Sequence, residues 1–541
     1  MQGGRPMACG GTAGEERMDR PNILIICSDQ HHPRAAGFLG SRVISTPSLD
    51  SLAAGGAVFS QCYCNYPLCT PSRMSFITGQ YAHRIHIPDN GFPLDPGIMT
   101  WARKLTESGY RTVMLGKMDF CGDYQDGGFA EHRVIRRRPA RKELQYIDGV
   151  PCLAIPSPTR RSDAFRSWGS VLRHMEHAGP RTARILPEAA EFGERDDFIG
   201  NYDHDQIVTQ WAVDFLQGQG LGQEQDSRPE QGSGRSGQTG RRSEQTGRPE
   251  DSPWLLYVGL VYPHEPFTVP AEYFDLYYPW RWELPADYSP DNPRLHPAMQ
   301  HLQRALGVGN PSNEALRRTL AAYAGMVTCL DDMIGRILAA LHSSGCDRNT
   351  YVIYLSDHGE SLGEHGLFFK KCPYDGAVRV PCVMRGPGIS EGSRIDQPVS
   401  LVDLYPTLME IAGLETFPEL PGRSWLPLAR SGGNPVHAGG AFAEYHGLLN
   451  YYDWFMIVRE GFKYVWYDGV APSLFHIAED PFELVDLGTD PAYAGVRKRY
   501  EEILRGMLDP EAVSRESRRQ LGLIGSAGED LRGEPPAAAS R

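Results

Sequence analysis

The chain has 541 residues, more than one hydrophobic core usually serves, so we expect one large domain and a smaller one. Hydrophobic residues make up 41% and charged residues 22% of the sequence, a balance typical of a globular enzyme. The formal net charge of −13 argues against a nucleic-acid or membrane-surface partner, because both select basic faces. An anionic substrate is still compatible, since a local cluster of cations can reverse the field inside one pocket.

The sequence indicates no targeting or membrane segment. Residues 1–18 lack the apolar stretch of a secretory signal, and we expect them to form a disordered tail. No run approaches the roughly 20 apolar residues of a membrane span. The eleven cysteines are an odd number without paired C-x-x-C units, so they do not indicate a zinc site, and we interpret Cys62 and Cys64 as structural thiols. These features favour a cytoplasmic protein.

Alternating strands and helices predict the fold class. Residues 22–27 form a continuous apolar run after a proline, the pattern of a strand buried on both faces of a parallel sheet. A helix is expected to begin at Thr46, as its N-cap, and Pro47, and a long amphipathic helix covers 314–341. The alternation predicts an α/β fold, a large mixed, mostly parallel sheet with helices on both faces. Its further predicted strands are 112–115, 254–261, 350–355 and 381–384.

Two changes of composition divide the chain. From 217 to 252 the sequence is rich in Gly, Gln, Ser, Arg and Glu with almost no aliphatic residue, so we expect a disordered surface insertion. After about residue 432, two apolar runs that flank Glu460 and Gly461 predict a β-hairpin, followed by another strand and a closing helix. The predicted units are a large α/β domain, an α+β subdomain with an antiparallel sheet, and a disordered tail, at 19–432, 433–514 and 515–541.

One short string suggests the chemistry. Cys69-Thr-Pro-Ser-Arg73, followed by Thr78-Gly79, resembles the C-x-P-S-R signature of formylglycine-dependent sulfatases of the alkaline-phosphatase-like superfamily. The resemblance implies that a formylglycine-generating enzyme oxidises Cys69 to an aldehyde, whose hydrate attacks sulfur with one hydroxyl and ejects sulfate with the other. Pro71 places residue 69 near a helix N-terminus, where backbone N–H groups favour an oxyanion. Arg73, one turn further on, is expected to hydrogen-bond the second hydroxyl.

Two polar strings at strand ends predict a metal site. Asp29 and Gln30 follow the first strand, and Asp357 and His358 follow the strand at 350–355, where sites of α/β proteins lie. The resemblance implies that these four residues and modified Cys69 hold one divalent cation. Oxygen-rich ligands suit Ca²⁺, or else Mg²⁺ or Mn²⁺. Gln30 stands where many relatives have a second aspartate. In this respect the sequence resembles the choline-sulfatase-like and phosphonate-monoesterase-like members of the family, which have glutamine at this position.

The resemblance also implies residues that bind and cleave the ester. Lys117 and Lys370 match the two lysines that contact the substrate sulfate. Neighbouring Lys371 is the alternative to Lys370 and is interpreted as solvated surface. His264 matches the family's H-x-P-F histidine, which faces the ester oxygen and can protonate the leaving group. Asp119 occupies a position that usually holds histidine, and this G-K-x-D form resembles arylsulfatase K. Its role is left open.

The resemblance covers roughly residues 20–490 and implies a sulfuric ester hydrolase acting on a small anionic sulfate ester. Because Asp119 replaces the usual histidine, a sulfated sugar or uronate is the favoured substrate. A phosphonate monoester or phosphodiester hydrolase of the same superfamily is the alternative, since those enzymes share the nucleophile and the Asp-Gln pair. If Cys69 is not oxidised, the chain would be a latent or ligand-binding protein. The aromatic stretch at 445–452 is interpreted as core.

Overall fold

A computed structural model describes most of the chain. The predicted tail at 1–18 lies outside the described residues, as does the predicted insertion apart from residues 217, 218 and 252. Among the described residues, no helix has the length and apolarity that crossing a membrane requires. The described residues are 20–135, 144–147, 150–153, 179–180, 200–218, 252–279, 288, 295–307, 311–433, 440–524 and 530.

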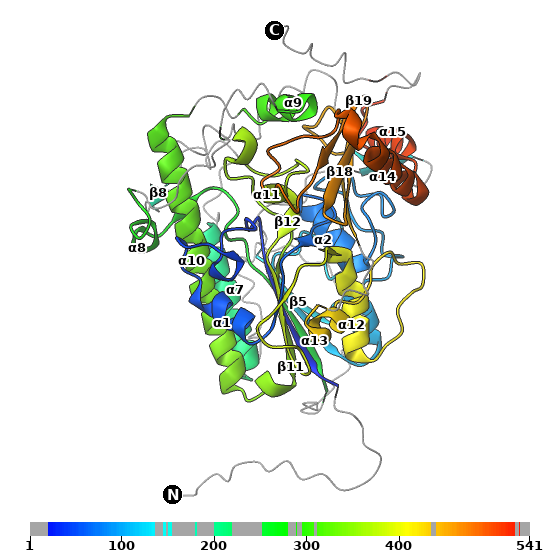
Figure 1. Cartoon of the computed structure of the whole chain (residues 1–541). Coiled ribbons are helices and arrows are strands. Elements are labelled where there is room, and N and C mark those ends of the chain that lie inside the picture. The colour runs from blue at the N-terminus through cyan, green and yellow to red at the C-terminus, as the bar shows by residue number, and fades with distance from the viewer. Residues whose placement is uncertain are drawn as a thin grey trace, which may run out of the picture.

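An eight-stranded mixed sheet forms the centre of the molecule, in the order β14-β2-β13-β11-β1-β9-β4-β5 (Figure 1). The central strand β1 is parallel to β11 on one side and to β9 on the other, and β9 is parallel to β4. β13 is antiparallel to β11, so the sheet is mixed, as predicted. The strands are β1 (Asn22–Ser28), β2 (Ala57–Phe59), β4 (Arg111–Gly116), β5 (Glu131–Arg133), β9 (Trp254–Gly259), β11 (Thr350–Ser356), β13 (Cys382–Arg385) and β14 (Ser393–Ile395).

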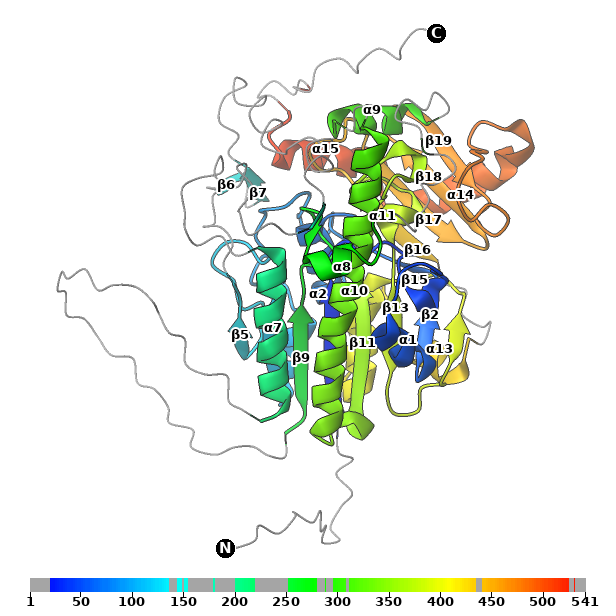
Figure 2. The same cartoon turned by 90° about the vertical axis from the view of Figure 1, so that its left-hand side faces the viewer.

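Helices cover both faces of this sheet, which is why its strands are continuous apolar runs. One face carries α1, α7 and α10, and the other carries α2, α12 and α13 (Figures 1 and 2). The predicted α/β class is therefore confirmed. The bounds are α1 (Pro47–Ala54), α2 (Cys69–Thr78), α3 (Trp101–Glu107), α7 (Asn201–Leu216), α10 (Asn313–Ser343), α12 (Leu404–Ala412) and α13 (Leu426–Ser431).

The first helix begins at the predicted residue but is capped differently. Thr46 is the N-cap of α1, yet its side chain accepts no hydrogen bond from the first turn and instead accepts one from the backbone N–H of Gly37, at 2.8 Å. The carboxylate of Asp331, in α10, accepts the backbone N–H groups of Ser48 and Leu49 at 2.9 and 2.8 Å. The start of α1 is thereby fixed to α10, and the expected Thr46 cap is corrected.

A second, antiparallel sheet follows in the order β16-β17-β18-β19. Figure 2 shows it beyond the carboxyl end of β9, and α14 packs on it. Alternate residues of β17 enter two cores: Trp454 and Met456 join the main core, whereas Phe455 and Ile457 pack toward α14. The sheet is thus apolar on both faces. The bounds are β16 (Ala441–Tyr445), β17 (Trp454–Arg459), β18 (Phe462–Tyr467), β19 (Val470–Phe475) and α14 (Ala494–Met507).

The predicted start of the C-terminal tail at residue 515 was too early, because helix α15 (Pro510–Gln520) continues to residue 520. This helix has little apolar surface and docks through polar contacts. Ser517 donates to the backbone carbonyl of His446 at 2.7 Å, and Arg518 pairs with Asp453 at 2.7 Å. A search for apolar periodicity does not detect such a helix. Residues 525–529 and 531–541 lie outside the described part of the chain.

Short elements complete the described structure. A three-stranded sheet in the order β12-β3-β15 lies next to α2, and two two-stranded sheets pair β10 with β8 and β6 with β7. The remaining elements are β3 (Cys62–Tyr63), β6 (Leu144–Ile147), β7 (Val150–Leu153), β8 (Gly179–Pro180), β10 (Thr268–Val269), β12 (Arg379–Val380), β15 (Val399–Ser400), α8 (Ala271–Phe274), α9 (Pro297–Ala305), α11 (Asp375–Val378), and 3-10 turns at Gly37–Leu39, Asp347–Asn349, Glu364–Gly366, Leu401–Asp403 and Pro491–Tyr493.

A buried lysine joins the second sheet to the main body. The ammonium of Lys463, on β18, lies 2.6 Å from the Asp375 carboxylate and 2.5 Å from that of Glu483, and its side chain is fully buried. We expect Lys463→Met to lower the free energy of unfolding by about 3–5 kcal/mol, because two buried carboxylates lose this ammonium, although Asp375 keeps the Arg379 guanidinium at 3.1 Å. Urea denaturation measures this loss. Lys498→Met, at a side chain 80% exposed, should change stability by less than about 1 kcal/mol.

Candidate active site

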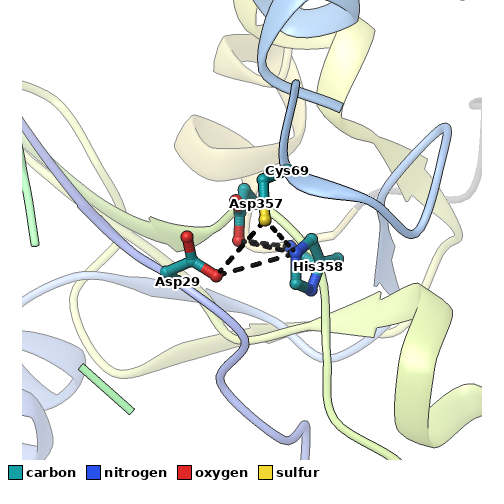
Figure 3. Close-up of side chains that lie close together, drawn as sticks. All are labelled: Asp29, Cys69, Asp357 and His358. Atoms are coloured by element: carbon teal, nitrogen blue, oxygen red, sulfur yellow. Dashed lines mark hydrogen bonds and ion pairs between the residues drawn. The ribbon is translucent and has the colours of Figure 1, made fainter. Parts of the chain in front are cut away.

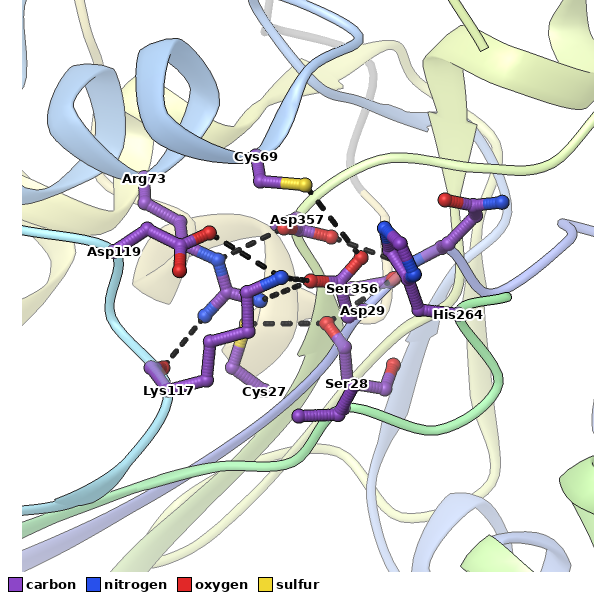
Figure 4. Close-up of polar contacts among 12 residues, drawn as sticks. Cys27, Ser28, Asp29, Cys69, Arg73, Lys117, Asp119, His264, Ser356 and Asp357 are labelled. Atoms are coloured by element: carbon purple, nitrogen blue, oxygen red, sulfur yellow. Dashed lines mark hydrogen bonds and ion pairs between the residues drawn. The ribbon is translucent and has the colours of Figure 1, made fainter. Parts of the chain in front are cut away.

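The candidate active site lies at the carboxyl ends of the central parallel strands. Asp29 directly follows β1, Asp357 directly follows β11, and Lys117 directly follows β4. Because these strands are parallel neighbours or separated only by β9, their carboxyl ends meet at one edge of the sheet. Cys69 is the first residue of α2, whose N-terminus points to the same edge (Figures 3 and 4). Residues nearly 330 positions apart in sequence are brought together there.

Asp29, Cys69, Asp357 and His358 form one compact, buried cluster (Figure 3). One ligand atom from each residue lies within 4.8 Å of all the others. The Cys69 sulfur is 3.3 Å from Nε2 of His358 and 3.9 Å from Oδ1 of Asp29. Two buried carboxylates with a neutral imidazole make an oxygen-rich, anionic donor set, so these residues fit a hard divalent cation.

The orientation of His358 suits a ligand role. Its Nδ1 lies 3.0 Å from the backbone carbonyl of Gly359, which can only accept, so Nδ1 carries the proton. The lone pair of Nε2 then faces the cluster. Burial, with the nearby Lys370 ammonium, holds the pKa of His358 well below its usual range, so the ring is neutral at physiological pH.

Arg73 contacts both carboxylates of the cluster, and its predicted hydrogen bond to the second hydroxyl of modified residue 69 stays a prediction. Its Nε donates to Oδ2 of Asp357 at 2.8 Å, and its Nη2 lies 3.3 Å from Oδ2 of Asp29. Its Nη1 donates to the backbone carbonyl of Lys117 at 2.8 Å and to the Tyr257 hydroxyl at 2.9 Å. The side chain is fully buried. The guanidinium therefore holds the two carboxylates in place.

The two predicted sulfate-binding lysines lie on either side of the cluster. Lys117 hydrogen-bonds Oδ2 of Asp29, and Lys370 lies 3.5 Å from the Cys69 sulfur and hydrogen-bonds the amide oxygen of Gln30. Asp119 lies 3.3 Å from the Lys117 ammonium (Figure 4). Burial alone would lower the pKa of Lys117, but Asp119 and Asp29 raise it above its ordinary value, so the ammonium stays charged. Asp119 is thus placed to orient Lys117.

Lys371 is buried, and its interpretation as solvated surface was wrong. Its side chain is 2% exposed, with the ammonium 3.5 Å from the backbone carbonyl of Leu448 and 5.8 Å from the centre of the Tyr445 ring. Its own carbonyl accepts the indole N–H of Trp454 at 3.1 Å. Phe369 and Lys371 both have positive φ, 67° and 80°, so this loop does not alternate inward and outward residues as an extended segment does.

His264 lies beside the cluster and is neutral. Its Nδ1 is 2.7 Å from the backbone carbonyl of Glu265, so the proton sits on Nδ1. Burial, reinforced by the ammonium groups of Lys370 and Lys117, lowers its pKa to about 4, although Glu265 opposes the shift. Burial and the Asp29 carboxylate raise the pKa of the Cys69 thiol to about 12, so an unmodified Cys69 is a protonated, weak nucleophile.

Sequence reasoning missed three residues that shape the site. Glu360 and Glu265 both accept hydrogen bonds from the Gln30 amide. Both lie close in sequence to residues that were predicted, Glu360 to His358 and Glu265 to His264. The amide oxygen of Asn90 accepts the backbone N–H of Thr70 at 2.9 Å, in the first turn of α2. Asn90 is 20 residues from that helix end, so no local capping pattern points to it.

Comparisons with known proteins find sulfatases among the chains that are similar to this one. The family model described as Sulfatase matches residues 21–414, and the model described as N-sulphoglucosamine sulphohydrolase, C-terminal, matches 363–509. Arylsulfatase K of Danio rerio is 27% identical, over 93% of this chain and 86% of its own length. Choline-sulfatase of Rhizobium meliloti (strain 1021) is 29% identical, over 87% and 83%. The phosphonate monoester hydrolase of Agrobacterium radiobacter has the same fold, with a TM-score of 0.65 at 24% identity, covering 94% of this chain and 99% of that chain.

Proposed function

This chain belongs to the sulfatase family, and we propose that it hydrolyses a sulfate monoester to an alcohol and inorganic sulfate, with formylglycine derived from Cys69 as the nucleophile. One observation carries the proposal. Cys69 lies at a helix N-terminus, 3.5 Å from the Lys370 ammonium and beside the carboxylates of Asp29 and Asp357. A protonated thiol there is a poor nucleophile, whereas the hydrate of an aldehyde offers two hydroxyl groups.

The proposed chemistry follows from that hydrate. One hydroxyl oxygen loses its proton and bonds to sulfur while the S–O bond to the alcohol breaks, and the alcohol oxygen takes up a proton. The second hydroxyl then loses its proton, the C=O bond re-forms, and the C–O bond to sulfate breaks. Water rehydrates the aldehyde, so the sum is ester plus water to alcohol plus sulfate. Lys117 and Lys370 are placed to bind the charged sulfate oxygens throughout.

We propose that Asp29, Gln30, Asp357, His358 and modified residue 69 hold one divalent cation, with Ca²⁺ the first candidate and Mg²⁺ or Mn²⁺ the alternatives. Such an ion supplies positive charge that polarises the sulfate oxygens and favours ionisation of the hydrate. Arg73 keeps both carboxylates aimed at the ligand position. The neutral His358 presents its Nε2 lone pair.

His264 is the proposed donor of the proton to the leaving alcohol. We expect His264→Gln to lower kcat/KM by about 10²- to 10⁴-fold for an alkyl sulfate. For 4-nitrophenyl sulfate the loss should be below about tenfold, because nitrophenolate leaves without protonation. The pKa of about 4 means that the charged imidazole is lost as pH rises above it, so kcat/KM for the alkyl sulfate should fall with rising pH. Equal losses for both substrates, or an unchanged pH profile in the variant, would exclude this role.

For the substrate class we propose a sulfated sugar or uronate. The support is the Lys117–Asp119 pair, since a carboxylate stands where histidine is usual and resembles the pattern of arylsulfatase K. A phosphonate monoester hydrolase is the second candidate, favoured by Gln30 beside Asp29. Rates on matched aryl sulfates and aryl phosphonates, and on sulfated monosaccharides, test the choice. A higher kcat/KM for the aryl phosphonate than for every sulfate ester would reject the sulfatase assignment.

The decisive first experiment is the mass of the peptide that contains Cys69, from protein expressed in its native host. The proposal expects an aldehyde or its hydrate at residue 69 in most molecules. An unmodified thiol, together with no turnover of any sulfate ester, would favour the latent or ligand-binding alternative. Formylglycine at residue 69 without turnover of any sulfate ester would support the proposed nucleophile but reject the proposed substrate class.

A further inference from the structure

The side-chain amide of Gln30 is held by three charged groups from two other loops. Its Nε2 donates to Oε2 of Glu265 at 2.7 Å and to Oε2 of Glu360 at 2.5 Å, and its Oε1 accepts from the Lys370 ammonium. The two glutamates follow β9 and β11, the strands on either side of β1. Both amide hydrogens and the amide oxygen of Gln30 are therefore used, and only one of its two flipped orientations satisfies all of them.

The carboxylate of Glu360 is fixed independently of Gln30. Its Oε1 accepts the backbone N–H groups of Leu362 at 3.0 Å and of Phe369 at 2.5 Å, so only Oε2 faces Gln30. Glu360 is fully buried. Burial raises the pKa of Glu360 to about 7, and in its ionised form Oε2 accepts from Gln30 and cannot donate to it, so the contact favours an N–H donor.

Residue 30 has a strained backbone conformation, which the side-chain contacts help to hold. Gln30 has a φ of 67°, and its backbone N–H lies 3.2 Å from Oδ1 of Asp357. A left-handed conformation at a glutamine persists only when its surroundings hold it. A carboxylate at position 30 would have no N–H group to donate to Glu265 and Glu360, so the two glutamates favour an amide over an acid.

We propose that Glu360 and Glu265 are positioning residues that select glutamine at position 30 and keep its amide oxygen directed toward Lys370 and the cation ligands. This inference rests on the cation site of the proposed function. It accounts for the departure from the paired aspartates of many relatives, because the residues around position 30 accept both amide N–H groups, which an aspartate does not have. The glutamates act through Gln30 and do not contact the substrate.

The variant that separates this role from folding is Glu360→Gln. Its Oε1 can still accept from Leu362 and Phe369, so the loop is retained, but its Nε2 then meets Nε2 of Gln30, and Gln30 must turn its amide over. We expect the affinity for Ca²⁺, measured by calorimetry on the purified protein, to fall about 10- to 100-fold. Glu364→Gln is the matched control. Its buried carboxylate binds Arg34 and His32 and has no contact with Gln30, so the affinity should be unchanged.

A double variant tests the pair without any cation. In metal-free protein, Gln30→Glu places a new carboxylate against the side chains of Glu265 and Glu360. Glu360→Gln places a new amide N–H group against the amide N–H group of Gln30. Each variant should therefore lower the unfolding midpoint. Combining them restores one donor and one acceptor, and we expect at least half of the summed loss to be recovered. Additive losses in the double variant, or unchanged Ca²⁺ affinity in Glu360→Gln, would overturn the inference. If the unaltered protein bound no divalent cation, the proposed cation site would fail, and the metal-free cycle would still decide whether Glu360 orients Gln30.

Discussion

Replacing Cys69 with alanine is expected to lower turnover of a sulfate ester by about 10⁴- to 10⁶-fold, the scale seen when a covalent nucleophile is removed. The loss follows because alanine can be neither oxidised to an aldehyde nor hydrated. Cys69 is 3% exposed, and its sulfur lies against Asp29, His358 and Lys370 and not in the apolar core, so the fold should persist. Initial rates with 4-nitrophenyl sulfate measure the effect, and circular dichroism checks the fold.

Two further variants make the Cys69 result specific. Cys329→Ala removes another buried thiol, on α10 and outside the cluster, and should keep activity within about tenfold of the parent. Cys69→Ser retains one hydroxyl but lacks the second, so it should become sulfated once and stop, with the added sulfonate visible by mass spectrometry. Near-normal turnover by Cys69→Ala would contradict the proposed mechanism, whatever the result for Cys329→Ala.

The edge of the sheet that holds the site could be predicted because its strands are recognisable in the sequence. Residues buried on both faces of a parallel sheet are continuous apolar runs, and the polar residue that ends each run falls at a known edge. Asp29, Lys117 and Asp357 each follow a strand in this way, and the structure brings all three together. The C-x-P-S-R string added Cys69, since Pro71 is in the first turn of a helix that begins at residue 69.

The parts that escaped prediction depend on contacts between distant segments. Residue spacing placed Arg73 near residue 69, but spacing does not show that two carboxylates from other strands compete for its guanidinium. Lys371 was interpreted as solvated surface, whereas the loop that contains it has positive φ at Phe369 and Lys371 and buries its side chain. The role of Glu360 requires knowing where Gln30 lies, 330 residues away. Helix α15 docks through hydrogen bonds, which leave no apolar periodicity.

Arg73→Met is expected to destabilise the metal-free protein by about 3–5 kcal/mol, since it takes the guanidinium from two fully buried carboxylates, of which Asp29 keeps the Lys117 ammonium. Arg73 bonds Asp357 at 2.8 Å and lies 3.3 Å from Asp29, and neither carboxylate is exposed to solvent that could screen it. Urea denaturation with a chelator present measures the loss. Arg505→Met, which breaks ion pairs at a side chain 43% exposed, should cost less than about 1 kcal/mol.

A divalent cation should repair part of the Arg73→Met defect, and this links the buried arginine to the proposed metal site. Asp29 and Asp357 are proposed ligands, so a bound cation supplies the charge that the variant lacks. Binding to the folded state alone adds about 2.7 kcal/mol of stability when the ligand is at a hundred times its Kd. We therefore expect saturating Ca²⁺ to raise the unfolding midpoint of Arg73→Met more than that of the parent. An equal or smaller rise would show that the cation does not bind between these two carboxylates.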